Sequence, residues 1–139
     1  MQTLKDLMTK NVQIIAPDDT IKAAALQMQK GGFGMLPVAE NDKMIGTISD
    51  RDIVIRAVAE GKEGATKVRD VMSVHVIWAF EDDSVATGAK LMSEHQIRRL
   101  PIVNAEKRLV GIVALGDFAV ESADIATAGE ALSEISKPA

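Results

Sequence analysis

A serine and an aspartate, Ser49 and Asp52, lie three residues apart just after an apolar stretch. A carboxylate accepts two hydrogen bonds at once, which suits the vicinal hydroxyls of a ribose. A serine hydroxyl beside a helix N-terminus suits a phosphate. The same spacing also fits a helix cap, in which Ser49 caps the helix and Asp52 lies in its first turn. Both interpretations stay open at this point.

The chain contains this pattern twice. Gly46 and Asp52 return 65 positions later as Gly111 and Asp117. The counterpart of Ser49 is Ala114, which cannot cap a helix, yet the aspartate persists. The repeat extends upstream at a spacing of 64 positions. The residues Asp6, Met8, Val12, Asp18, Asp19, Met28 and Pro37 return as Asp70, Met72, Val76, Asp82, Asp83, Met92 and Pro101.

Two arginines, Arg98 and Arg99, precede Leu100-Pro101 in the second copy only. Two guanidinium groups at the start of a strand could clamp a phosphate, or they could be a solvated charge pair. Their counterparts in the first copy are Gly34 and Met35, so the fold itself does not require them.

The sequence gives little support for metal binding, catalysis, nucleic-acid binding or membrane attachment. His75 and His95 lie twenty residues apart in a chain without cysteine, so we expect no metal site and no catalytic base. There is no activated nucleophile and no glycine-rich phosphate loop. Sixteen basic against twenty acidic residues give a net charge of −4, which argues against nucleic-acid binding. No signal-peptide pattern and no membrane-spanning stretch is found, so we expect a cytoplasmic protein without membrane attachment.

Hydrophobic periodicity predicts an α+β fold of two β-α-β-β-α repeats. We expect the repeats to pack through their sheets with pseudo-twofold symmetry, followed by a C-terminal helix. The expected strands are 12–15, 35–39, 44–48, 76–80, 100–103 and 109–113. The first expected helix follows the turn at 17–20, with Asp19 or Thr20 as its N-cap, and stops at Gly31 and Gly32. The other expected helices are 50–60, 83–95, 117–123 and 124–136, with helical turns at 4–8 and 68–72.

The repeats divide the chain into residues 1–61, a linker at 62–67, residues 68–123 and a tail at 124–139. Together they are expected to form one compact module. The helix at 50–60 carries apolar residues on more than one side. We therefore expect it to be buried on several sides, which favours a homodimer.

The duplicated motifs together resemble those of the CBS (cystathionine-β-synthase) domain, and the chain resembles the tandem pair called a Bateman module. The resemblance covers residues 4–123 and rests on motifs that recur in register. These are Met8-Thr9 and Met72-Ser73, the helix entries 17–21 and 81–85, Leu36-Pro37-Val38 and Leu100-Pro101-Ile102, and Gly46 to Asp52 and Gly111 to Asp117.

The resemblance implies a regulatory, ligand-sensing module without catalysis. Such pairs commonly bind AMP, ADP, ATP, S-adenosylmethionine or NAD in two clefts between the repeats, and commonly dimerise through their helices. It also implies that the aspartate of each motif holds the ribose. A serine or threonine three residues earlier supports the ribose or a phosphate.

Carried onto this chain, the resemblance implies two sets of ligand-binding residues. The first set is Thr47, Ser49 and Asp52, with Ile77 and Ile97 from the other repeat. The second set is Ile112 and Asp117, with Arg98 and Arg99 on a phosphate and Gln13 and Phe33 near the base. Ala114 departs from the family pattern in the second set. We expect the second site to bind the more highly charged end of a nucleotide.

Three classes of function remain to be compared. The leading hypothesis is an adenine-nucleotide-responsive regulatory protein that acts on a protein target. The alternative is a ligand-free scaffold for interaction or dimerisation, in which the aspartates only cap helices. An enzyme is the third class, and no residue pattern supports it.

Overall fold

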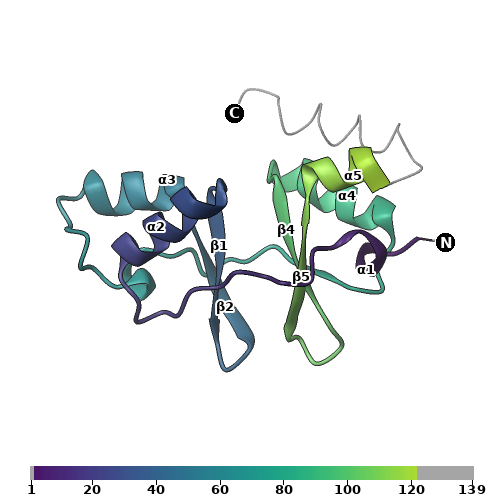
Figure 1. The fold of residues 1–139 in the computed structure, drawn as a ribbon, viewed down its shortest axis with the longest axis horizontal. Coiled ribbons are helices and arrows are strands. Elements are labelled where there is room, and N and C mark those ends of the chain that lie inside the picture. Colours follow the sequence, from purple (N-terminus) through teal and green to yellow (C-terminus); the bar gives the residue numbers. More distant parts are fainter. Residues whose placement is uncertain (1, 122–139) are drawn as a thin grey trace. The chain divides into compact units, whose positions relative to one another are not determined.

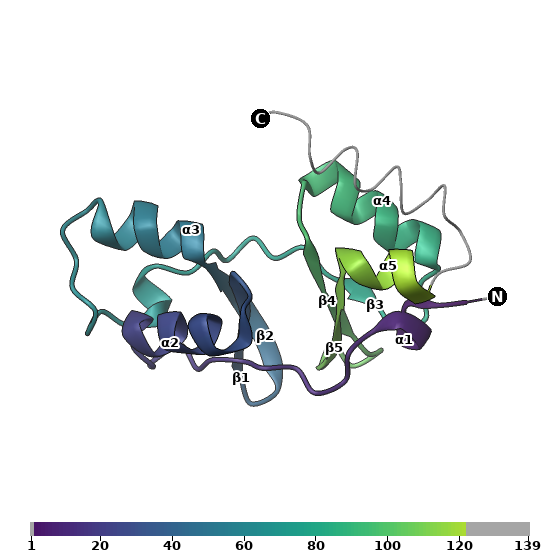
Figure 2. The same cartoon turned by 45° about the horizontal axis from the view of Figure 1, so that its top comes forward.

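The computed structural model describes residues 2–121, which divide into two compact units (Figures 1 and 2). One unit is Gln13–Val76, and the other joins the residues up to Val12 to those from Ile77 onward. The opening residues of each sequence repeat therefore belong to the unit built around the other repeat. The expected C-terminal helix at 124–136 lies outside the described residues.

The unit Gln13–Val76, called here the first unit, is built around an antiparallel hairpin. Its helices cover one face of that hairpin and form a core with it. The elements are α2 (Ile21–Gly31), β1 (Met35–Glu40), β2 (Lys43–Ser49), α3 (Asp50–Asp52) with a π-helical continuation (Ile53–Val58), and a 3₁₀ turn (Val68–Asp70). Its core residues are Ile15, Ile21, Ala24, Met28, Leu36, Val38, Ile48, Ala57, Val68 and Val71.

Local sequence signals set the limits of these elements. The Thr20 side chain accepts a hydrogen bond from the Ala23 amide and begins α2. Gly32 ends it in the left-handed conformation at φ 68°. Asn41 and Asp42, with φ of 54° and 65°, form the two-residue turn between β1 and β2.

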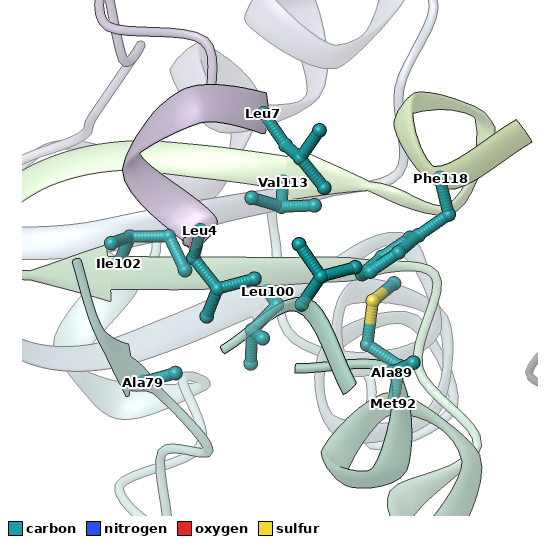
Figure 3. Close-up of a cluster of buried hydrophobic side chains, with 10 residues drawn as sticks. Leu4, Leu7, Ala79, Ala89, Met92, Leu100, Ile102, Val113 and Phe118 are labelled. Atoms are coloured by element: carbon teal, nitrogen blue, oxygen red, sulfur yellow. The ribbon is translucent and has the colours of Figure 1, made fainter. Parts of the chain in front are cut away.

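The second unit holds a three-stranded sheet in the order β3-β4-β5, in which β3 is parallel and β5 antiparallel to β4. Its helices lie on one face of the sheet, around the core shown in Figure 3. The elements are α1 (Leu4–Leu7), β3 (Ala79–Phe80), α4 (Val85–His95), β4 (Arg99–Val103), β5 (Leu109–Ala114) and α5 (Leu115–Glu121). Leu4 and Leu7 of α1 join this core and are 0% and 2% exposed, which fixes the N-terminus to this unit.

In each unit, a methionine side chain packs against a glycine in the second strand of the hairpin. In the first unit Ser73 pairs with Thr47 of β2, and a Cβ on Gly46 would lie 2.6 Å from the Ser73 carbonyl oxygen and 3.1 Å from the Met72 sulfur. In the second unit Thr9 pairs with Ile112 of β5, and a Cβ on Gly111 would meet the Met8 side chain. The repeated glycine and the repeated Met-Thr or Met-Ser motif thus recur together because they pack against each other.

The mixed α+β class and both hairpins are confirmed, whereas several expected elements differ. The expected strand at 12–15 is wrong, because only Ile15 pairs with the sheet, through a single parallel bridge to Val38. The second-repeat strand at 76–80 is reduced to Ala79–Phe80. Helix α4 begins at Val85 because the Ser84 side chain caps it.

The helix expected at 50–60 is present, but from Ile53 to Val58 it is π-helical. The expectation that it is buried on several sides is not met within one chain, and its burial in a homodimer stays a prediction. Ala57 is fully buried, whereas Val54, Ile55 and Val58 are 56%, 51% and 66% exposed. Within residues 2–121, no helix has the length and apolar character that crossing a membrane requires.

The glycine contact gives a stability prediction. Gly46→Ala should lower the free energy of unfolding by about 1–3 kcal/mol, because its Cβ would press against a backbone oxygen that cannot move alone. Urea denaturation of purified protein measures this change. Gly116→Ala is the matched control, since nothing lies within 4 Å of its Cβ position. A Gly46→Ala variant as stable as that control would contradict the contact.

Candidate functional site

The Asp52 carboxylate lies where β2 ends and α3 begins. Its Oδ2 accepts a hydrogen bond from the Ser49 amide at 3.0 Å, and the Ser49 hydroxyl accepts one from the Asp52 amide at 3.0 Å. This reciprocal pair is a capping box, so the capping interpretation of the spacing is confirmed. The Asp52 side chain is only 14% exposed. A carboxylate has about four acceptor positions, so capping leaves others for a ligand.

Asp117 lies at the equivalent place in the second unit, where β5 leads into α5. Its Oδ2 accepts a hydrogen bond from the Ala114 amide at 2.8 Å. Ala114 has no hydroxyl to return the contact, so only half of the capping box is present. The amide-to-carboxylate bond is therefore the part that both repeats keep.

In each unit, a backbone hydrogen bond joins the first residue of the helix to the residue just before the neighbouring strand. The Asp50 amide donates to the Gly34 carbonyl at 2.9 Å, and the Leu115 amide donates to the Arg98 carbonyl at 2.9 Å. These bonds place Arg98 and Arg99 at the start of β4, beside the beginning of α5.

Arg99 pairs with Ala114 across the sheet, which brings its guanidinium into the field of Asp117. Burial lowers the pKa of Arg99, and the negative charge of Asp117 opposes that shift. Arg99 is half-buried, whereas Arg98 is exposed. The structure therefore brings Arg99 and Asp117 together and leaves Arg98 at the surface.

Two further predicted residues lie at the sheet edges. Thr47 is half-buried and exchanges backbone hydrogen bonds of 3.0 and 2.8 Å with Ser73. Ile112 is 4% exposed and exchanges bonds of 2.8 and 3.0 Å with Thr9. Thr47 lies on β2 and Ile112 on β5, the strands that lead into the helices carrying Asp52 and Asp117.

The remaining predicted residues are divided between the two units. Ile77 and Ile97 are half-buried and pack against the core of the second unit. Phe33 packs against the core of the first unit, and Gln13 is exposed at the beginning of that unit. The groupings that combine residues of both units remain predictions.

Two residues near Asp52 were missed by the sequence analysis. The Ser73 hydroxyl donates to Asp52 Oδ1 at 3.4 Å, and Arg56 Nε lies 3.8 Å from the same oxygen. A signal for Arg56 was available, because residues four apart on a helix are neighbours. Ser73 belongs to a repeated motif, but its contact with Asp52 joins residues 21 positions apart.

No group of three histidine, cysteine, aspartate or glutamate side chains within residues 2–121 is arranged to hold a metal ion. His75 and His95 are both exposed.

Comparison with known families agrees with the duplicated geometry. The family model of the CBS domain matches residues 4–58 and again residues 68–124. The chain belongs to the CBS domain family. The two matches correspond to the two sequence repeats, so the chain is a tandem CBS pair.

Individual CBS proteins match over most of their length. The CBS domain-containing protein YhcV of Bacillus subtilis (strain 168) is 43% identical over 136 residues, 98% of this chain and 96% of YhcV. The crystal structure of Hypoxic Response Protein I, with two coordinated zinc ions, superposes with a TM-score of 0.78 at 33% identity, covering 86% of this chain and 98% of that one. The CBS domain pair of MJ0100, in complex with 5′-methylthioadenosine and S-adenosyl-L-methionine, gives 0.73 at 30%, covering 86% and 94%.

The incomplete cap gives a second stability prediction. Ala114→Ser should raise the free energy of unfolding by about 1 kcal/mol, because it supplies the hydroxyl that Ser49 provides in the first repeat. Ser49→Ala should lower it by a similar amount. Thermal unfolding followed by circular dichroism compares the two. A loss of stability in Ala114→Ser would show that the two helix starts are not equivalent.

Proposed function

We propose that this CBS pair is a non-catalytic regulatory protein that binds an adenosine-containing ligand, with AMP, ADP or ATP as the first candidates. The ribose hydroxyls would donate to the carboxylates of Asp52 and Asp117. Membership of a family of regulatory modules supports this proposal. So does the MJ0100 pair, whose structure is a complex with two adenosine-containing molecules.

The observation that carries the proposal is the fixed carboxylate at both helix starts. Each Oδ2 accepts the amide three residues earlier, at 3.0 Å for Asp52 and 2.8 Å for Asp117. The second aspartate keeps this position although its capping partner is an alanine. A rigidly held carboxylate loses little conformational entropy when it binds a diol.

The side chains that could bind the phosphate end of the ligand differ between the two units. In the second unit, Arg99 and the exposed Arg98 would bind a phosphate. In the first unit, the positions that correspond to Arg98 and Arg99 are Gly34 and Met35, and Ser49 contributes a neutral hydroxyl. We therefore expect the second site to prefer the more highly charged ligand.

The ligand-free scaffold remains a second candidate, because a specific observation favours it. The capping box accounts for both Ser49 and Asp52 without any ligand. The two candidates differ in whether any nucleotide stabilises the folded chain.

A thermal-shift panel with AMP, ADP, ATP, S-adenosylmethionine and NAD distinguishes them. A ligand at a hundred times its dissociation constant should add about 2.7 kcal/mol to the free energy of unfolding. We expect at least one ligand to stabilise the protein. That shift should disappear in the double variant Asp52→Asn/Asp117→Asn, which keeps an oxygen for each cap but loses the negative charge.

Asp50→Asn is the control for charge, because its exposed carboxylate bonds only the neighbouring Arg51 amide among the contacts described for it. This variant should retain the full shift. Arg99→Ala should weaken the second site and reduce its dependence on salt. No shift with any ligand, or a full shift in the double variant, would contradict the ribose role.

We also propose that the chain forms a homodimer through its exposed apolar helix, acts on a protein target and works in the cytoplasm. Val54, Ile55 and Val58 are more than half exposed on one helix, and Leu26 of α2 is 45% exposed. Large apolar side chains grouped at a surface commonly mark an interface.

The dimer is tested by light scattering after size exclusion. Val58→Glu should shift the protein to a monomer, because a charge would be buried in the interface. Val74→Glu is the matched control, since Val74 is 62% exposed but lies outside that helix. A wild-type chain that is already monomeric would contradict the proposal.

A further inference from the structure

The second oxygen of the Asp52 carboxylate already has protein neighbours. Oδ1 accepts the Ser73 hydroxyl at 3.4 Å and lies 3.8 Å from Arg56 Nε. Its partner Oδ2 is taken up by the Ser49 amide. A ribose that donates to Asp52 therefore meets a carboxylate on which each oxygen already accepts one protein hydrogen bond, so that about one acceptor position is left on each.

These neighbours tie the start of α3 to the chain segment that leaves the first unit. Ser73 exchanges backbone hydrogen bonds with Thr47, and Arg56 Nη1 donates to the Met72 carbonyl at 3.2 Å. The first unit ends at Val76, three residues after Ser73. Contacts with the Asp52 carboxylate therefore hold the final segment of the unit in place.

The described part of the second unit lacks this arrangement. Thr9 is the counterpart of Ser73 and makes the same backbone pairing, with Ile112. Among the residues that the structure describes, no hydrogen bond runs from the Thr9 hydroxyl to Asp117, and the counterpart of Arg56 is an acidic residue, Glu121. The two sites therefore differ in what their aspartate contacts before any ligand arrives.

We propose that the Ser73 hydroxyl is an internal competitor for the ribose at Asp52, so that it lowers the ligand affinity of the first site. This inference rests on the proposed function. The hydroxyl has one proton, and in the free protein it is donated to Oδ1. A ribose hydroxyl that takes the acceptor position used by Ser73 displaces it, and the segment ending at Val76 then loses a side-chain contact with the helix. Ligand binding at the first site thereby changes the contacts of the segment that leads into the second unit.

The test is calorimetric titration of AMP, and separately of 5′-methylthioadenosine, into the full chain carrying Asp117→Asn, so that the first site is observed. Adding Ser73→Ala should tighten binding about twofold, less than one ordinary hydrogen bond would give, because the 3.4 Å contact is long. Ser73→Thr keeps the hydroxyl and should bind like the parent. Thr9→Ala is the matched control and should also leave the affinity unchanged.

The outcomes separate this inference from the function on which it rests. Unchanged or weaker binding in Ser73→Ala, with binding still abolished by Asp52→Asn, would overturn the competitor role alone. If neither ligand binds the parent or the wild-type chain, the proposed function is contradicted and the competitor role with it. Weaker binding in Ser73→Thr than in Ser73→Ala agrees with competition, since a bulkier hydroxyl side chain occupies the same oxygen.

Discussion

The hydrogen bond from a backbone amide to the aspartate three residues later is the contact on which each candidate site depends. It joins the last residue of a hairpin to the first turn of the next helix, from Ser49 to Asp52 and from Ala114 to Asp117. Because the amide belongs to the strand, the carboxylate is positioned by the sheet as well as by the helix. A group held in this way needs little rearrangement to bind a diol, and the same bond stabilises the helix without ligand. In the proposed function, capping and ligand binding are thus two uses of one geometry.

The repeats have kept this geometry while their surroundings have diverged. Asp52 has a serine cap, the Ser73 hydroxyl and a guanidinium from its own helix. Asp117 has an alanine in place of the cap and the half-buried Arg99 from the neighbouring strand. Two sites with a shared carboxylate and different cations would respond to ligands of different charge. A duplicated module can in this way respond to two ligands, or to one ligand over two concentration ranges.

The sequence predicts the local structure well, because hairpins, caps and helix stops depend on neighbouring residues. The two hairpins and the cap formed by Ser49 and Asp52 are examples. The exchange of opening segments could not be predicted in the same way. Met8 and Met72 lie in nearly identical motifs, so the pattern cannot say which glycine each one contacts. The strand expected at 12–15 failed because β-branched composition does not supply a pairing partner. Ser73 was missed for a similar reason, since its contact with Asp52 arises only when the segment pairs with β2.

The most direct test of the central claim is a crystal structure of the chain grown with AMP. The account predicts ribose hydroxyls within hydrogen-bonding distance of the Asp52 or Asp117 carboxylate, with the amide-to-carboxylate bond of that aspartate still in place. At Asp52, the Ser73 hydroxyl should have turned away from Oδ1. A nucleotide bound elsewhere, with both carboxylates bonded only to protein, would contradict the account.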